Sequence, residues 1–115
     1  MNIIISKSNR KDKKLKAVID NKKTVHFGAT GYSVFTTHED EERKQLYIKR
    51  HKKNEDWSNP TTAGFYAKNI LWNKSTVQAS INDTNSKFKN INIIFKKVKY
   101  NSITSYNYIL FALTR

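Results

Sequence analysis

Residues 23–72 read KTVHFGATGYSVFTTHEDEERKQLYIKRHKKNEDWSNPTTAGFYAKNILW. This segment holds all three Gly, the only Pro, all three His, both Trp and most of the acidic residues of the chain. It predicts, in order, a strand, a Gly-containing loop, a charged helix, a turn and an aromatic helix. The rest of the chain is interpreted outward from these elements.

The length and composition indicate one small domain. A chain of 115 residues does not support two hydrophobic cores. The absence of Cys excludes disulfides and thiolate chemistry. No apolar run approaches the roughly 20 residues that cross a bilayer, so we expect no membrane span. We expect a domain over residues 1–97 and an apolar tail over 98–115 that is a strand or a docking segment.

The first part of the chain predicts an antiparallel sheet. Asn2–Lys7, Leu15–Asp20 and Thr24–Phe27 are short apolar runs separated by polar turns, which is typical of a meander. Ile91–Phe95 is a candidate fourth strand. With the helices below, the expected fold class is α+β, a small antiparallel sheet with about three helices packed on one face.

Three helices follow from capping residues and apolar periodicity. The first is expected to start near Thr37 or His38 and to run to about Lys53, with Thr37 as its cap. The second is expected over Ala63–Trp72, and the third after Thr76. The first helix should bury Leu46, Tyr47 and Ile48. The third should bury Val77, Ile81, Thr84 and Phe88, which share a helical face. The predicted organising centre around the first helix comprises His26, Gly28, Gly31, Tyr32, Trp57, Gly64, Phe65 and Trp72.

The net charge of +13 is unevenly distributed. Residues 1–23 carry eight basic and two acidic residues (+6), residues 24–56 carry six of each, and residues 57–115 carry eight basic and one acidic (+7). Such an excess favours polyanions, namely nucleic acid, an acidic protein surface or lipid headgroups. A coding bias that enriches Lys, Asn and Ile together is the alternative explanation.

Two clusters of basic residues are candidates for contact with phosphate. One lies in the first turn of the sheet and the other at the end of the first helix, where cations also favour the helix dipole. Ordinary solvation of loops and helix ends is the alternative. The candidate nucleic-acid-binding residues are Arg10, Lys11, Lys13, Lys14, Arg50, Lys52 and Lys53.

The sequence contains no motif for a metal, a cofactor or catalysis. No HExxH, Walker or dinucleotide-binding pattern occurs. His38 and His51 would lie about 20 Å apart along a helix, too far to share an ion. A nuclease centre that uses His38 or His51 with Arg50 is the enzymatic alternative. We expect no catalytic residue, no metal and no cofactor.

The central segment resembles a family of small uncharacterised proteins that are encoded by large double-stranded DNA viruses of protists and algae. The resemblance covers about residues 2–95. The chain departs from it at Val34, Glu39 and Ser75, where Asp, Lys and Pro are usual. The resemblance is carried by KTVHFG (23–28), GYS (31–33), TH (37–38) to ERK (42–44), YIKRH (47–51), Trp57, TAGF (62–65), LWNK (71–74) and SI (80–81).

This resemblance implies a viral origin and carries no activity or site residue with it. Two functions are therefore expected from the charge and the viral origin. The first is nonspecific binding of the DNA or RNA backbone. The alternative is a virion or minor capsid protein that docks on acidic viral capsid or core proteins. The expected location is the virion or the viral factory in the host cytoplasm.

Overall fold

Three antiparallel strands form the first half of the sheet. The computed structural model describes residues 1–30 and 40–96. Strand β1 (Asn2–Lys7) pairs with β2 (Lys13–Ile19), and β2 pairs with β3 (Lys23–Ala29), both antiparallel. Asp20 and Asn21 both have positive φ, and the amide of Lys22 donates to the carbonyl of Ile19 at 2.9 Å. This is the left-handed hairpin turn that Asp and Asn tolerate best, so the predicted meander and its turn are confirmed.

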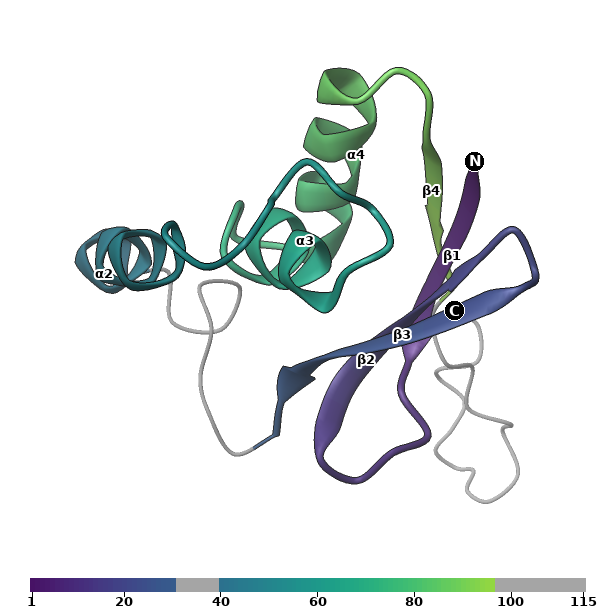
Figure 1. The fold of residues 1–115 in the computed structure, drawn as a ribbon, viewed down its shortest axis with the longest axis horizontal. Coiled ribbons are helices and arrows are strands. Elements are labelled where there is room, and N and C mark those ends of the chain that lie inside the picture. Colours follow the sequence, from purple (N-terminus) through teal and green to yellow (C-terminus); the bar gives the residue numbers. More distant parts are fainter. Residues whose placement is uncertain (31–39, 97–115) are drawn as a thin grey trace, which may run out of the picture.

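The fourth strand makes the sheet mixed. Strand β4 (Asn92–Phe95) lies parallel to β1, and the strand order is β3-β2-β1-β4. The predicted fourth strand therefore exists, although it is not antiparallel to its neighbour. A parallel direction requires a long connection, which is present here because the chain passes from β3 through the helices before it returns beside β1. The predicted α+β class is confirmed (Figure 1).

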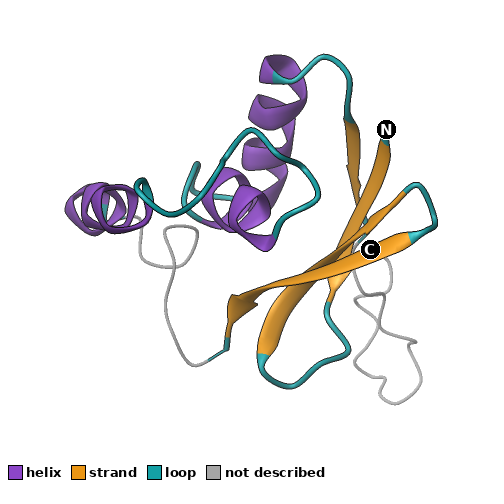
Figure 2. Cartoon of the chain, in the orientation of Figure 1, coloured by secondary structure: helices purple, strands orange, loops and turns teal. Residues whose placement is uncertain are grey.

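The helices gather on one side of the sheet (Figure 2). Within residues 1–30 and 40–96 they are α2 (Glu41–His51), α3 (Ala63–Tyr66), which continues as the π-helical turn η1 (Ala67–Leu71), and α4 (Val77–Lys87). Alternation along β1 directs Ile3 and Ile5 toward the helices, where both are buried. None of the helices in the described residues is long and apolar enough to cross a membrane.

The predicted caps are confirmed for two helices and corrected for one. Thr62 accepts a hydrogen bond from the amide of Phe65, and Thr76 accepts one from the amide of Ala79. The prediction for the first helix was wrong at its start. Asp40 caps α2 by accepting from the amides of residues 42 and 43, because a carboxylate there satisfies two free amides. The helix ends at His51 with Lys52 as its C-cap, close to the predicted end near Lys53.

Buried aromatic and aliphatic side chains from the second and third helices fill the core. Phe65 and Tyr66 have no exposed surface. Ile81 and Thr84 are also buried, and Val77 and Phe88 are partly buried, so the predicted apolar face of α4 is confirmed. The second helix differs from expectation, because its later half has π-helical geometry. There the Asn69 side chain donates to the carbonyl of Phe65 at 2.9 Å.

Helix α2 is packed less tightly than predicted. Tyr47 is buried and Ile48 is half-buried, but Leu46 is 51% exposed. The prediction that Leu46 lies inward was wrong. Of the three apolar residues predicted to face the core, only Tyr47 and Ile48 do so.

The predicted organising centre is only partly assembled. Phe65 and Trp72 are buried in it, and Trp57 is half-buried. His26 lies on the sheet face opposite the helices, because it alternates with the inward-facing Val25 and Phe27. Its assignment to the centre was therefore wrong. Gly31 and Tyr32 lie outside the described residues, as do Thr37, His38 and the tail over 98–115.

Candidate nucleic-acid interface

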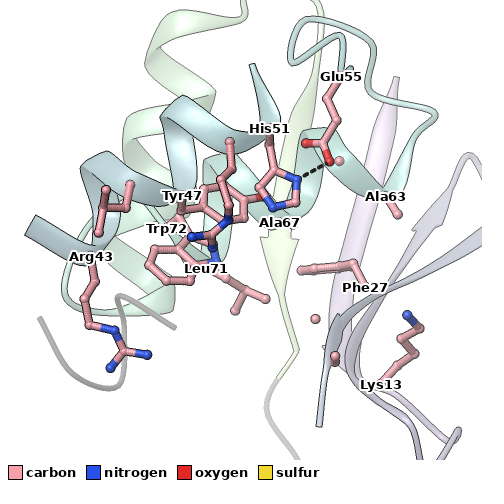
Figure 3. A pocket seen from close by; sticks show the side chains of 15 residues that line it. Lys13, Phe27, Arg43, Tyr47, His51, Glu55, Ala63, Ala67, Leu71 and Trp72 are labelled. Atoms are coloured by element: carbon pink, nitrogen blue, oxygen red, sulfur yellow. Dashed lines mark hydrogen bonds and ion pairs between the residues drawn. The ribbon is translucent and has the colours of Figure 1, made fainter. Parts of the chain in front are cut away.

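A cleft of about 650 Å³ opens between helix α2, the α3–η1 segment and the end of strand β3. Phe27 and Lys13 stand on the sheet side, and Tyr47, Leu71 and Trp72 stand on the helix side (Figure 3). The cleft exists because α2 reaches the rest of the core through few inward side chains. Its volume is in the range of sites that bind small molecules.

A stack of three rings forms the helix-side wall. The Tyr47 and Trp72 rings are 4.5 Å apart at 6°, and the His51 ring lies 4.3 Å from Tyr47 on α2. Burial raises the pKa of the Tyr47 phenol, and the nearby charge of Glu55 raises it further. Tyr47 is therefore a neutral packing residue that anchors α2.

Among the described residues, Glu55 is the one acidic side chain that lines the cleft, and both of its oxygens are hydrogen-bonded to neighbouring side chains. One carboxylate oxygen lies 2.8 Å from Nδ1 of His51, and the other accepts from the indole nitrogen of Trp57 at 2.8 Å. Gly64 allows this approach, since a Cβ there would lie 3.0 Å from the carboxylate. The carboxylate thus fixes the loop after α2, and within the described residues it forms no ion pair with the Lys and Arg side chains of the cleft.

Three cations line the cleft without a counter-ion. They are Lys13 from β2 and Arg43 and Arg50 from α2. Within residues 1–30 and 40–96, none of the three side chains forms an ion pair or a hydrogen bond. Arg43 and Arg50 are exposed and Lys13 is half-buried. Unpaired guanidinium groups at the edge of a hollow are suited to phosphate.

The structure brings together two of the predicted site residues, Lys13 and Arg50. Lys14 is half-buried, and its side chain lies close to Gly28 without lining the cleft. Arg10 is held by Asp12, with nitrogen–oxygen distances of 2.8 and 3.1 Å, and this hydrogen bond lowers the pKa of Asp12. The predicted residues that do not line the cleft are Arg10, Lys11, Lys14, Lys52 and Lys53.

Arg43 belongs to the site but was not among the predicted residues. It lies three, four and seven residues before Leu46, Tyr47 and Arg50, so the four share one helical face. A stripe with two Arg and an apolar residue between them was the available signal. It was missed because Leu46 was assigned to the core.

A serine–histidine contact on the opposite face of the sheet was also missed. Ser8 Oγ lies 2.7 Å from Nδ1 of His26, and the amide of Arg10 donates to the same oxygen at 3.0 Å. Ser8 is buried. The contact closes the β1–β2 turn, and strand pairing, not sequence proximity, brings the two residues together.

The described residues bring together no group of three His, Asp or Glu side chains that could bind a metal ion. His26 and His51 lie on different elements and are engaged by Ser8 and Glu55, respectively. His38, which entered the metal and nuclease alternatives, lies outside the described residues.

Comparison with known proteins gives one match. Residues 3–51 are similar to a family of unknown function (DUF5754). The matched segment spans the three antiparallel strands and α2, and it contains Lys13, Arg43 and Arg50. Neither the curated proteins nor the solved structures contain a significant match.

Proposed function

We propose that this chain is a small, non-enzymatic viral protein that binds the phosphate backbone of nucleic acid without sequence specificity. The observation that supports the proposal most directly is that Lys13, Arg43 and Arg50 line one cleft and form no ion pair with any of the residues that the structure describes. The resemblance of residues 2–95 to proteins of large DNA viruses supports the viral origin.

The overall charge supports the same proposal. A net charge of +13 on 115 residues produces a field that steers polyanions toward the protein. The end of α2 adds exposed Lys49, Lys52 and Lys53 beside the cleft. Backbone binding needs such a broad cationic surface and no base-reading motif.

Binding without catalysis is proposed because of the composition of the cleft. Apart from Glu55 and His51, the described side chains that line it are cationic or apolar, and Glu55 and His51 are hydrogen-bonded to each other. The nuclease alternative remains testable with the same material. Cleavage of an oligonucleotide that stops in a His51→Ala variant would contradict the non-enzymatic proposal.

The test is a salt titration of the full chain with duplex and single-stranded oligonucleotides of unrelated sequence. We expect binding at about 50 mM salt that weakens linearly on a log–log plot. Arg50→Glu should reduce the slope by about one and weaken binding about tenfold. Lys49→Glu is the matched control, because it makes the same charge change on the same turn outside the cleft, and it should have the smaller effect. Absence of binding to every oligonucleotide at low salt would overturn the proposal.

A second function, docking on acidic viral capsid or core proteins, is favoured by one different observation. The sheet face opposite the helices carries an apolar row in which Ile94, Ile4 and Val18 are adjacent in register. Ile94 is 57% and Ile4 38% exposed. This function would be favoured if the protein associates with virus particles and the association persists at high salt. The association should also persist in Arg50→Glu and be lost in Ile94→Asp.

A further inference from the structure

The cleft has two chemically different parts, and backbone binding uses only one. Lys13, Arg43 and Arg50 form a cationic rim. Phe27 and Leu71, together with Ala63 and Ala67, form an apolar floor. Phosphates on the outside of a duplex would contact the rim and leave the floor empty. A ligand that uses both parts has an anionic group joined to a flat, largely apolar group.

The rim places its cations on both sides of this floor. Arg43 and Arg50 are seven residues apart on α2, which corresponds to about 10.5 Å along the helix. Lys13 faces them from the sheet, where it stands on the same side as Phe27 (Figure 3). A ligand that enters between α2 and β3 therefore passes between cations before it reaches the apolar floor.

The exposed Leu46 fits the same interpretation. Leu46 lies between the two Arg on the helical face that lines the cleft, and it is 51% exposed. It contributes little to the core, so it is available to contact a ligand. An apolar side chain between two guanidinium groups suits the face of a base flanked by phosphates.

The three-ring stack limits how a base can bind. Both faces of the Tyr47 ring are covered, by His51 and by Trp72. A base must therefore rest on the floor and on the accessible part of His51, whose side chain is 39% exposed. Both Glu55 oxygens already have donors. Contacts of this kind are apolar and tolerate any base.

We infer that the cleft binds one unstacked nucleotide of a single strand, with the base on the apolar floor and the adjoining phosphates on Lys13, Arg43 and Arg50. The inference rests on the proposed function and adds to it a preference for single strands. A base in a duplex is stacked and paired and cannot enter, whereas a base in a single strand is free to turn into the cleft.

The test introduces a bulky side chain at the apolar floor of the cleft without changing the charge of the protein. Ala63 lines the cleft and is exposed at the start of α3, so Ala63→Trp adds a ring without overpacking the core. Gln78→Trp is the matched control, because it adds the same ring at an exposed position on α4 away from the cleft. The affinities of a 12-residue thymidine oligonucleotide and of a duplex with the same number of phosphates are measured at one salt concentration, by fluorescence anisotropy.

We expect the single strand to bind the unaltered chain about tenfold more tightly than the duplex, because contact with one base contributes roughly the free energy of a tenfold change in affinity. Ala63→Trp should remove most of that difference and leave duplex affinity unchanged, and Gln78→Trp should change neither. Thymidine monophosphate should compete with the single strand better than inorganic phosphate does.

Two outcomes separate this inference from the proposed function. Equal affinity for single strand and duplex, or an equal loss for both in Ala63→Trp, overturns the nucleotide cleft and leaves backbone binding in place. Absence of binding to either overturns both. Leu46→Ala gives an independent check, since it removes an exposed contact without adding bulk. Circular dichroism shows whether Ala63→Trp is folded. If Ala63→Trp is misfolded and Leu46→Ala keeps the full preference for single strands, the inference also fails.

Discussion

The two sides of the α3–η1 segment differ in how their polar groups are paired. On the side of α4, the fully buried Thr84 donates to the carbonyl of Ser80 at 2.8 Å, and the Asn73 side chain donates to the carbonyl of Asn69 at 3.1 Å. On the side of α2, Arg43 and Arg50 have no partner among the described residues. On the α4 side these polar groups are paired within the chain, whereas on the α2 side two guanidinium groups are available to a ligand, although Glu55 there is paired with His51 and Trp57.

This difference separates stability from binding. Buried donors and acceptors that lose a partner cost free energy on folding, so the α4 side is fixed by the requirements of the core. Exposed cations impose no such cost, and the chain can keep them for an external anion. Substitutions on the α4 side should therefore act on stability, and those on the cleft side chiefly on affinity.

The largest expected effect is on the free energy of unfolding when a core ring is removed. Phe65 has no exposed surface and packs against Tyr66 and Phe88. Phe65→Ala should lower that free energy by about 3–5 kcal/mol, measured by urea unfolding. Leu46→Ala is the contrasting variant on the cleft side and should cost less than about 0.5 kcal/mol. Comparable losses in the two variants would contradict the division into two sides.

Gly28 lies where the sheet meets the cleft, and it tests an exception to that division. Its φ is +80°, and a Cβ on it would lie 2.6 Å from Cδ1 of Leu71. Gly28→Ala should lower the free energy of unfolding by about 3 kcal/mol, because both strain and a clash oppose the methyl group. A fully stable variant in thermal or urea unfolding would show that β3 adjusts freely at this point.

A smaller effect is expected at the edge of β4. The side-chain nitrogen of Asn85 donates to the backbone carbonyl of Ile93 at 3.0 Å, and its side-chain oxygen accepts from the backbone N–H of Ile93 at 2.8 Å. The side chain thus makes the two hydrogen bonds that a neighbouring strand would make. Asn85→Ala should cost about 1–2 kcal/mol in urea unfolding and expose the strand edge. Asn82→Ala, which removes only an exposed contact with Gln78, should be nearly neutral. Equal effects would refute the edge-capping role.

The smallest effect is the pH dependence of stability that Asp83 contributes on the α4 side. Hydrogen bonds from Asn73 and Lys87 lower the pKa of Asp83 below its ordinary value of 3.8. A lowered folded-state pKa stabilises the fold above the unfolded pKa, and this contribution is lost as pH falls through the folded pKa. Unfolding free energies of wild type and Asp83→Asn should differ by less than about 1 kcal/mol at pH about 5 and converge in stronger acid. A difference that grows with acidification would contradict this sign.

The sequence predicted the helices and strands better than it predicted which of their residues lie together in the folded chain. The strands near residues 2–7 and 13–29, the caps Thr62 and Thr76 and the buried face of α4 all follow from near neighbours. The start of α2 was misplaced because Thr37 and Asp40 are both acceptable caps. Of the site, Lys13 and Arg50 were predicted, whereas Arg43 was not, because the exposed Leu46 beside it was assigned to the core.

By itself, the sequence determined the strand and helix types, the Asp20–Asn21 turn and the excess of positive charge. These depend on side-chain periodicity, local hydrogen bonds and composition, all of which act over a few residues. Only the tertiary structure decided that β4 returns parallel to β1, that Asn85 covers its edge, and that Lys13 faces Arg43 and Arg50 across an apolar floor. Such contacts join residues far apart in the chain, and they depend on how all the elements share one core.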